Sequence, residues 1–430
     1  MPQFMPFRGL RYTAAAGPVS ELLAPPYDVI SPAQQAALAA RNARNAVRLE
    51  LAEGGEERYA QVGALLEHWL VAGFVERDPA GMFYVYEQSF VEEGQRYTRR
   101  AVIAAVEAQP WEAGAVKPHE FTMSGPKDDR LKLLEAARTQ FSPVFMIARD
   151  RAGQLRQFIE DTISSRGPDA EGATIDGDEH RLWVVEGGRY EMRRLAPLLA
   201  ESFYIADGHH RYETAVSYWQ QQAKRGVDIP RDHPARFAMT AIVAADDPGL
   251  VIRPIHRIVP RPAPVNWADT LGDAFDIAGA GSIEDLASRP AGIEPLLAEG
   301  PGTIIALNAE PGRAHCLRLR SPEAMASRLP PGRSERWAAI APNVLRYGVL
   351  EPLWGIGDDD LKAGAVEYTH DTAEAFAAIA SRPATTAFLI NHVGIGEVMA
   401  LADQGERMPQ KSTFFHPKLG TGLVFYPLYS

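Results

Sequence analysis

Residues 207–211, near the middle of the chain, form a turn made of Asp207, Gly208, His209, His210 and Arg211. The apolar residues 203–206 before it predict a buried strand, and the pattern after it predicts a helix from His209. A turn between a strand and a helix presents free backbone N–H groups, and such groups bind anions. Gly208 lets a ligand approach the backbone, and Arg211 can donate two hydrogen bonds to one phosphate. The turn therefore predicts a phosphate-binding site.

The same turn offers groups for catalysis. Asp207 can bind Mg²⁺, and His210 can accept or donate a proton near neutral pH. Adjacent histidines point in different directions, so His209 and His210 rarely ligate one metal ion together. We expect Gly208, His209 and Arg211 to contact phosphate, and Asp207 and His210 to act in catalysis. The alternative for at least one of the imidazoles is a hydrogen bond to the backbone.

A second polar loop, residues 116–130, contains two prolines and a glycine that exclude regular structure over most of its length. Within it, Glu120 is expected to act as a general base on a substrate hydroxyl. His119 and Thr122 are expected to contact the substrate. Lys127 and Arg130 are expected to neutralise phosphate oxygens. The alternative is a solvated, charged loop that leads into a capped helix.

Two further proline-bounded stretches complete the candidate site. In residues 24–32 we expect Tyr27 and Asp28 to contact the substrate, with a turn or helix cap as the alternative for Asp28. In residues 408–418 the expected nucleotide contacts are Lys411, Ser412 and Thr413. These three resemble the end of a phosphate-binding loop, but the upstream glycines of a Walker A motif are absent.

The elements around these loops predict a mixed α/β fold. Residues 82–90 and 98–106 predict a β-hairpin, whose continuously apolar residues 101–106 should lie in the centre of a sheet. Further strands are expected at residues 45–50, 141–148, 203–206 and 237–244. Helices are expected at residues 56–72, 128–139, 154–164 and 209–224.

The chain has 430 residues, which is more than one ordinary domain. The proline-rich residues 260–264 suggest a boundary between a core domain, residues 1–260, and a C-terminal α/β domain, residues 261–430. The core carries the 207–211 turn, and the C-terminal domain contributes Lys411, Ser412 and Thr413.

Composition excludes several classes of function. The net charge of −11 argues against broad binding of nucleic acids or anionic membranes. The single cysteine, Cys316, allows neither an intrachain disulfide nor a thiolate metal cage. The first residues do not resemble a secretory signal, and no apolar run is long enough to cross a bilayer. We therefore expect a cytoplasmic protein with no membrane partner.

Several of these stretches resemble the signature blocks of the DUF1015 family, whose function is not settled. They occur in the expected order along nearly the whole chain: Ala24-Pro-Pro-Tyr-Asp-Val-Ile30, His119-Glu-Phe-Thr122, Pro126-Lys-Asp-Asp-Arg-Leu131, Ser142-Pro-Val-Phe145, Ala206-Asp-Gly-His-His-Arg-Tyr-Glu-Thr-Ala215 and Met408-Pro-Gln-Lys-Ser-Thr-Phe-Phe415.

The Gly208 to Arg211 segment is also similar to the phosphate-contacting motif of the ParB/sulfiredoxin superfamily, which includes free serine kinases. That resemblance implies a ParB/sulfiredoxin-like core with a mixed sheet, in which Gly208, His209, His210 and Arg211 cradle nucleotide phosphates. Sulfiredoxins need a cysteine in this turn. His209 occupies that position here, so reduction of a sulfinic acid through that thiol is excluded.

These observations favour a phosphotransferase that uses Mg²⁺ and ATP or ADP. Its partners would be the nucleotide and a small hydroxylated metabolite, such as free serine, and a homodimer is possible. The main alternative is a ParB-like regulatory protein that binds nucleotide without kinase activity. A third hypothesis is a metal-dependent hydrolase using His119, Glu120 and His209, but the second histidine of the zinc-protease motif is missing.

Overall fold

The computed structural model describes residues 3–121, 125–300 and 302–429. The chain divides into two compact units, each described here by itself. Unit 1 comprises Met1–Pro118, Thr122–Val251 and Pro417–Ser430, and unit 2 comprises His119–Phe121 and Ile252–His416. The domain boundary at residue 260 stays a prediction.

Unit 1 is built on a nine-stranded sheet with the order β6-β11-β8-β12-β5-β4-β10-β9, in which β1 also pairs with β5. Its strands are β1 (Phe4–Met5), β4 (Met82–Glu92), β5 (Gln95–Glu107), β6 (Val116–Lys117), β8 (Val144–Ala148), β9 (Ala170–Ala173), β10 (Glu179–Glu186), β11 (Phe203–Asp207) and β12 (Phe237–Ala244). The β12–β8 and β11–β6 pairs are parallel, whereas β4, β5 and β12 pair antiparallel. The predicted mixed α/β fold with a mixed sheet is confirmed.

The predicted hairpin forms from β4 and β5, and β5 lies inside the sheet between β4 and β12. Residues 101–106 of β5 are all buried, because neighbours cover both edges of this strand and both of its faces. The hairpin therefore supplies the rigid centre of unit 1, next to the strands that lead into the polar loops.

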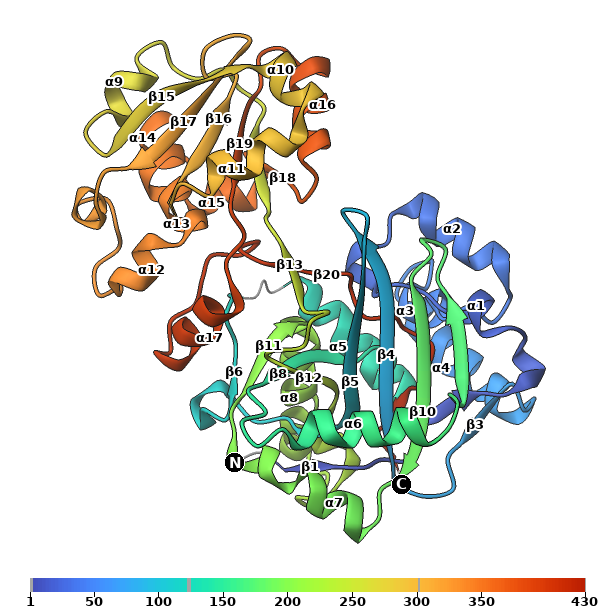
Figure 1. Cartoon of the computed structure of the whole chain (residues 1–430). Helices are drawn as coiled ribbons and strands as arrows, with labels where there is room; N and C mark the ends of the chain where they lie inside the picture. The colour runs from blue at the N-terminus through green and yellow to red at the C-terminus, as the bar shows by residue number, and fades with distance from the viewer. Residues whose placement is uncertain (1–2, 122–124, 301, 430) are drawn as a thin grey trace. The chain divides into compact units, whose positions relative to one another are not determined.

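Helices pack on this sheet and carry the loops of interest. Figure 1 shows α6 (Gln154–Ser165) crossing one face of the strands, and its buried side chains Leu155, Phe158 and Ile159 join the core of the sheet. Helix α8 (His209–Lys224) adds Tyr212 and Ala215 to the same core. The other helices and 3₁₀ turns of unit 1 are η1 (Ala14–Ala16), α1 (Val19–Leu22), η2 (Tyr27–Val29), α2 (Pro32–Arg41), α3 (Val47–Glu50), α4 (Glu57–Val71), η3 (Trp111–Ala113), α5 (Gly125–Ala137), α7 (Arg189–Leu195), η4 (Ala196–Ala200) and η5 (Pro234–Arg236).

The strand predicted at residues 45–50 is wrong, since α3 occupies this segment. The side chain of Asn45 decides the conformation. Its Oδ1 accepts a hydrogen bond from the Val47 N–H at 2.9 Å, and its Nδ2 donates to the carbonyls of Glu21 and Leu23 at 2.7 and 3.0 Å. Such local bonds favour a turn or helix start over a strand. The resulting helix ends at Glu50.

Two small sheets complete unit 1. Strand β2 (Leu10–Tyr12) pairs with β3 (Val75–Arg77), and β7 (Thr139–Gln140) pairs with β21 (Tyr426–Pro427) near the end of the chain. The C-terminal segment thus returns to unit 1 and places residues 417–429 beside much earlier parts of the sequence.

Unit 2 contains a six-stranded sheet with the order β15-β17-β16-β19-β14-β18, and a two-stranded sheet of β13 and β20. Alternate residues of the central strands face different cores. Ile304 and Ala306 of β16 pack with α9, α13 and α14, whereas Ile305 and Leu307 pack with α10, α11 and α16. The strands are β13 (Val251–Arg253), β14 (His256–Val259), β15 (Phe275–Ser282), β16 (Ile304–Leu307), β17 (Arg313–Leu319), β18 (Glu367–Thr369), β19 (Thr386–Ile390) and β20 (Phe414–His416). The helical segments are α9 (Trp267–Leu271), α10 (Ile283–Ser288), η6 (Pro290–Gly292), α11 (Ile293–Leu297), η7 (Pro322–Met325), α12 (Glu335–Ala339), α13 (Ala341–Leu345), the π-helix η8 (Arg346–Leu350), α14 (Glu351–Trp354), α15 (Asp358–Lys362), α16 (Thr372–Ser381) and α17 (Ile395–Asp403).

Across the described parts of the chain, no helix combines the length and the apolar character needed to cross a membrane.

Candidate functional site

The turn of residues 207–211 has the predicted arrangement of strand, glycine and helix. Strand β11 ends at Asp207, Gly208 has a φ of +87°, and α8 begins at His209. A φ in this range is the left-handed region, which glycine adopts without the steric penalty of a Cβ atom. A Cβ on Gly208 would also lie 2.9 Å from Nε of Arg211. Glycine is therefore required by both the backbone and the neighbouring guanidinium.

Two cations meet at the Asp207 carboxylate. Arg211 Nη2 donates to Asp207 Oδ2 at 2.5 Å, and Lys418 Nζ forms an ion pair with Oδ1. Burial alone raises the pKa of Asp207, but the charges of Lys418 and Arg211 outweigh it and lower that pKa below its ordinary value. All three side chains are largely buried. The aspartate thus holds two positive side chains close to the N-terminus of α8.

The segment that carries Lys418 is fixed by the central hairpin. Arg99 of β5 donates to the Pro417 carbonyl at 2.6 Å, and Gln88 of β4 donates to the Lys418 carbonyl at 3.1 Å. Burial lowers the pKa of Arg99, and its guanidinium lies 4.8 Å from the ring centroid of Phe145. Sequence reasoning missed Lys418, because no spacing relates a lysine near the C-terminus to an aspartate about 200 residues earlier.

The two histidines lie at the start of α8, and both are half-buried. His209 contributes to the lowered pKa of Asp207, and the His210 carbonyl accepts a hydrogen bond from Thr214 Oγ1 at 2.7 Å. Their predicted roles, His209 in phosphate binding and His210 in catalysis, stay predictions.

Tyr27 and Asp28 lie in η2 and interact electrostatically with Arg211. Burial lowers the pKa of Arg211, but Asp207 and then Asp28 outweigh it and raise that pKa. Burial raises the pKa of Tyr27 to about 12 against the opposing charge of Arg211, so the phenol is protonated at neutral pH. The structure thereby brings together three predicted residues that are far apart in the sequence.

Lys127 and Arg130, both predicted to contact phosphate, lie on α5 and have protein partners on other elements. Lys127 forms an ion pair with Glu213 of α8. Arg130 donates to the Glu50 carbonyl at 3.0 Å and to Glu50 Oε2 at 3.2 Å, and its guanidinium lies 4.1 Å from the ring centroid of Tyr27. These contacts join α5 to α8, α3 and η2, and the predicted phosphate contacts of both residues stay predictions.

In unit 2, four predicted residues form one cluster around Glu120. Glu120 Oε1 accepts hydrogen bonds from the backbone N–H groups of Ser412 and Thr413 at 3.0 and 3.1 Å, and from Thr413 Oγ1 at 3.2 Å. His119, which is buried, lies with its Nε2 at 2.8 Å from Thr413 Oγ1. Neither the direct pairing of these two distant loops nor the backbone N–H groups that orient the carboxylate were predicted from the sequence.

The neighbouring loop residues have mainly structural contacts. Ser412 is buried and donates its hydroxyl hydrogen to the Pro409 carbonyl at 2.7 Å. Lys411 is exposed, has a φ of +62°, and its carbonyl accepts a hydrogen bond from Arg257 Nη2 at 2.9 Å. Burial lowers the pKa of Arg257 to about 10. Sequence reasoning gave Arg257 no role, and Thr122, a predicted substrate contact, lies outside the described residues.

The arrangement of the possible ligand side chains limits which metal ions the protein could bind. Within the residues that the structure describes, no group of three His, Cys, Asp or Glu side chains is placed to hold a metal ion. A zinc site of three protein ligands, as the hydrolase hypothesis requires, is therefore absent from this part of the chain. Mg²⁺ differs, because it commonly binds one or two carboxylates together with substrate phosphates. Asp207 is the carboxylate that the turn offers for that arrangement.

Gly208→Ala is expected to destabilise the fold by about 1–2 kcal/mol, the penalty of a left-handed residue with a Cβ atom, and to displace the Arg211 guanidinium. Thermal unfolding measures the first effect, and nucleotide affinity measures the second. Gly94→Ala is the matched control, because Gly94 has a φ of +78° but its Cβ would meet nothing within 4 Å. If both variants lose equal stability and neither changes nucleotide affinity, the contact between residue 208 and Arg211 has no role in binding.

Comparison with known proteins gives a family and several distant structural neighbours. A search of curated proteins found no match. Among solved structures, a free serine kinase in complex with AMP is 13% identical, with 73% of this chain and 86% of that chain covered and a TM-score of 0.36. A conserved hypothetical protein from Pyrococcus furiosus is 15% identical, with 74% of this chain and 93% of that chain covered and a TM-score of 0.34. SbnI with a C-terminal truncation, from Staphylococcus aureus, is 9% identical, with 74% of this chain and 84% of that chain covered and a TM-score of 0.35.

One family model matches residues 4–331, which is most of the chain. That range includes every resembling block except the last, Met408-Pro-Gln-Lys-Ser-Thr-Phe-Phe415. The chain belongs to DUF1015, a family described as proteins of unknown function.

Proposed function

We propose that this protein is a phosphotransferase that uses Mg²⁺ and ATP or ADP to phosphorylate a small hydroxylated metabolite, such as free serine or a related amino acid. The observation that carries the proposal is the meeting of Arg211 and Lys418 at Asp207, beside Gly208 and the N-terminus of α8. Two cations lie there next to the positive end of a helix. Backbone N–H groups at a helix N-terminus and cationic side chains are the groups that bind phosphate oxygens.

In this proposal the turn binds the phosphates. The backbone at Gly208 and His209, together with the side chains of Arg211 and Lys418, forms the cradle. Asp207 keeps both cations in position before the nucleotide arrives, which reduces the reorganisation needed during the reaction. Mg²⁺, when bound with the nucleotide, neutralises phosphate charge, and Asp207 is its proposed protein ligand. Because both oxygens of Asp207 carry a cation, ligation of Mg²⁺ requires one ion pair to open.

Glu120 is the proposed general base. The donors from Ser412 and Thr413 fix the position of its carboxylate, the group that would accept the proton. His119 supports this arrangement through Thr413. A base of this kind takes the proton of the acceptor hydroxyl while the hydroxyl oxygen forms a bond to the terminal phosphorus of the nucleotide. The bond from that phosphorus to the bridging oxygen breaks, and ADP leaves if the donor is ATP, or AMP if the donor is ADP.

The direct test is turnover by the full chain. Purified protein is incubated with ATP or ADP, MgCl₂ and a panel of hydroxylated amino acids, and phosphorylated product and nucleotide are quantified by mass spectrometry. We expect product with at least one amino acid, and none when EDTA is present. If nucleotide is neither bound nor consumed, the proposal fails. Nucleotide binding without consumption would favour the regulatory alternative.

A further inference from the structure

A small cavity in unit 1, named here the Glu50 cavity, lies beside the turn. Its polar lining includes Tyr27, Glu50, Arg130, Thr139 and Arg211, and its volume is about 50 Å³. One water molecule needs about 10–15 Å³ on the same measure. The cavity therefore has room for several non-hydrogen atoms of a ligand.

Two buried oxygen atoms on its wall lack a hydrogen-bond partner among the described residues. Glu50 is 3% exposed, and while its Oε2 accepts from Arg130, its Oε1 accepts from no protein donor. Thr139 is 1% exposed, and its Oγ1 is also without a partner. A buried carboxylate oxygen without a hydrogen-bond donor carries a desolvation penalty. Both atoms are therefore placed to receive a ligand that carries hydrogen-bond donors.

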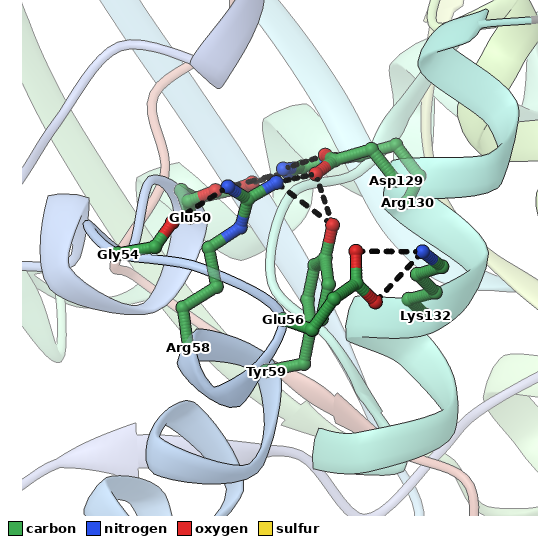
Figure 2. Close-up of polar contacts among 8 residues, drawn as sticks. All are labelled: Glu50, Gly54, Glu56, Arg58, Tyr59, Asp129, Arg130 and Lys132. Carbon is green, nitrogen blue, oxygen red and sulfur yellow. Dashed lines mark hydrogen bonds and ion pairs between the residues drawn. The ribbon is translucent and has the colours of Figure 1, made fainter.

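The position of Glu50 is fixed by a chain of polar contacts, shown in Figure 2. Arg130 donates to Asp129 Oδ2 through Nε and Nη2 at 2.9 and 2.6 Å. Asp129 Oδ1 accepts in turn from Arg58 Nη2 at 2.7 Å and from the Tyr59 hydroxyl at 2.8 Å. The guanidinium of Arg130 therefore cannot rotate to satisfy Glu50 Oε1 without breaking contacts to Asp129. The cavity is built to leave that oxygen available.

The lining of the Glu50 cavity also carries a positive charge, opposite in sign to the Glu50 carboxylate. Arg211 lines it, and the phenol of Tyr27, which is protonated at neutral pH, lines it as well. A guanidinium and a phenol are suited to a carboxylate, whereas Glu50 Oε1 is suited to an ammonium group. Leu133, Leu134 and Phe141 supply the apolar remainder of the wall. A ligand that satisfies both charged ends carries an ammonium and a carboxylate within a few bonds of each other.

We infer that the Glu50 cavity binds a small zwitterion of the α-amino acid class, with Glu50 Oε1 accepting from its ammonium group and Arg211 and Tyr27 facing its carboxylate. Thr139 Oγ1 provides a further polar contact. This inference rests on the proposed function, in which the zwitterion is the phosphate acceptor.

Binding of matched probes to the full chain tests the inference without turnover. L-serine and glycine carry both charges, L-glycerate has the configuration of L-serine but a hydroxyl in place of the ammonium group, and ethanolamine lacks the carboxylate. By calorimetry without nucleotide, we expect the zwitterions to bind about tenfold or more tightly than either single-charge probe, the effect of one charged hydrogen bond. If no zwitterion binds at millimolar concentration, or if L-glycerate binds as well as L-serine, the inference is overturned.

Glu50→Gln is expected to lower L-serine affinity by about tenfold and to remove the preference over L-glycerate. Thr139→Val keeps the side-chain shape and is expected to lower L-serine affinity by a smaller factor. This variant replaces Glu50→Gln in the experiment if Glu50→Gln does not fold. Glu56→Gln is the matched control, because Glu56 pairs with Lys132 at an exposed position near the same network. Unchanged L-serine affinity in folded Glu50→Gln protein overturns the inference.

The inference and the proposed function can fail separately. Glu50-dependent binding of L-serine without nucleotide consumption supports the cavity assignment and contradicts the phosphotransferase. Phosphorylation of a metabolite without an amino group, with a KM that Glu50→Gln does not change, supports the phosphotransferase and contradicts the cavity assignment.

Discussion

Arg211→Ala is expected to reduce kcat/KM for phosphoryl transfer by about 100-fold or more and to weaken nucleotide binding. The reason is that Arg211 is the cation on α8 that Asp207 holds beside Gly208, through a hydrogen bond of 2.5 Å. Its loss removes a planar donor suited to phosphate oxygens. Initial rates and nucleotide titrations measure the effect, and Arg211→Lys is expected to recover only part of it, because a lysine cannot make two parallel hydrogen bonds.

Arg225→Ala provides the matched control for that experiment. Arg225 follows the last residue of the same helix and makes an exposed ion pair with Glu135, so its loss should change both activity and stability little. Thermal unfolding of each variant separates loss of function from loss of fold, since Arg211 also donates to the Pro143 carbonyl. Wild-type nucleotide affinity in a folded Arg211→Ala protein would contradict the phosphate cradle.

The second large effect is expected from Glu120→Gln, which should lower kcat by about 10²–10⁴-fold, the usual contribution of a general base. Glutamine keeps the shape of the side chain, and its amide oxygen can still accept from the backbone of Ser412 and Thr413. The fold and the nucleotide affinity should therefore change little. Steady-state kinetics together with nucleotide titration distinguish a change in kcat from a change in binding.

The pH dependence gives that experiment an independent readout. A carboxylate base makes kcat fall as pH decreases through its pKa, and the variant should lose this limb of the profile. Glu367→Gln is a suitable control, because Glu367 pairs with Arg382 at an exposed position of unit 2. A Glu120→Gln protein with undiminished kcat would remove Glu120 from the chemistry and leave it as a residue that orders the 408–413 loop.

Local patterns in the sequence were enough to predict the strands and the helix that carry the turn of residues 207–211. The apolar run before Asp207 forms β11, the helix predicted at residues 209–224 is α8, and the strand predicted at residues 237–244 is β12. The two strands are apolar runs that are buried almost throughout, and α8 has a helical period that matches its buried face, so tertiary packing and local preference agree. Residues 45–50 show the opposite case, because side-chain hydrogen bonds of Asn45 override the strand preference of the segment.

The sequence by itself determined which residue types stand at the ends of strands and helices, and from them the family and the turn of residues 207–211. Only the tertiary structure decided which charges share a carboxylate. Lys418 reaches Asp207 because the C-terminal segment returns to the central hairpin, and Glu50 keeps an unsatisfied oxygen because Asp129 holds Arg130 in place. These facts depend on contacts between residues far apart in the chain. Hydrophobic periodicity reports burial along one element, so it carries no information about which polar groups meet across several.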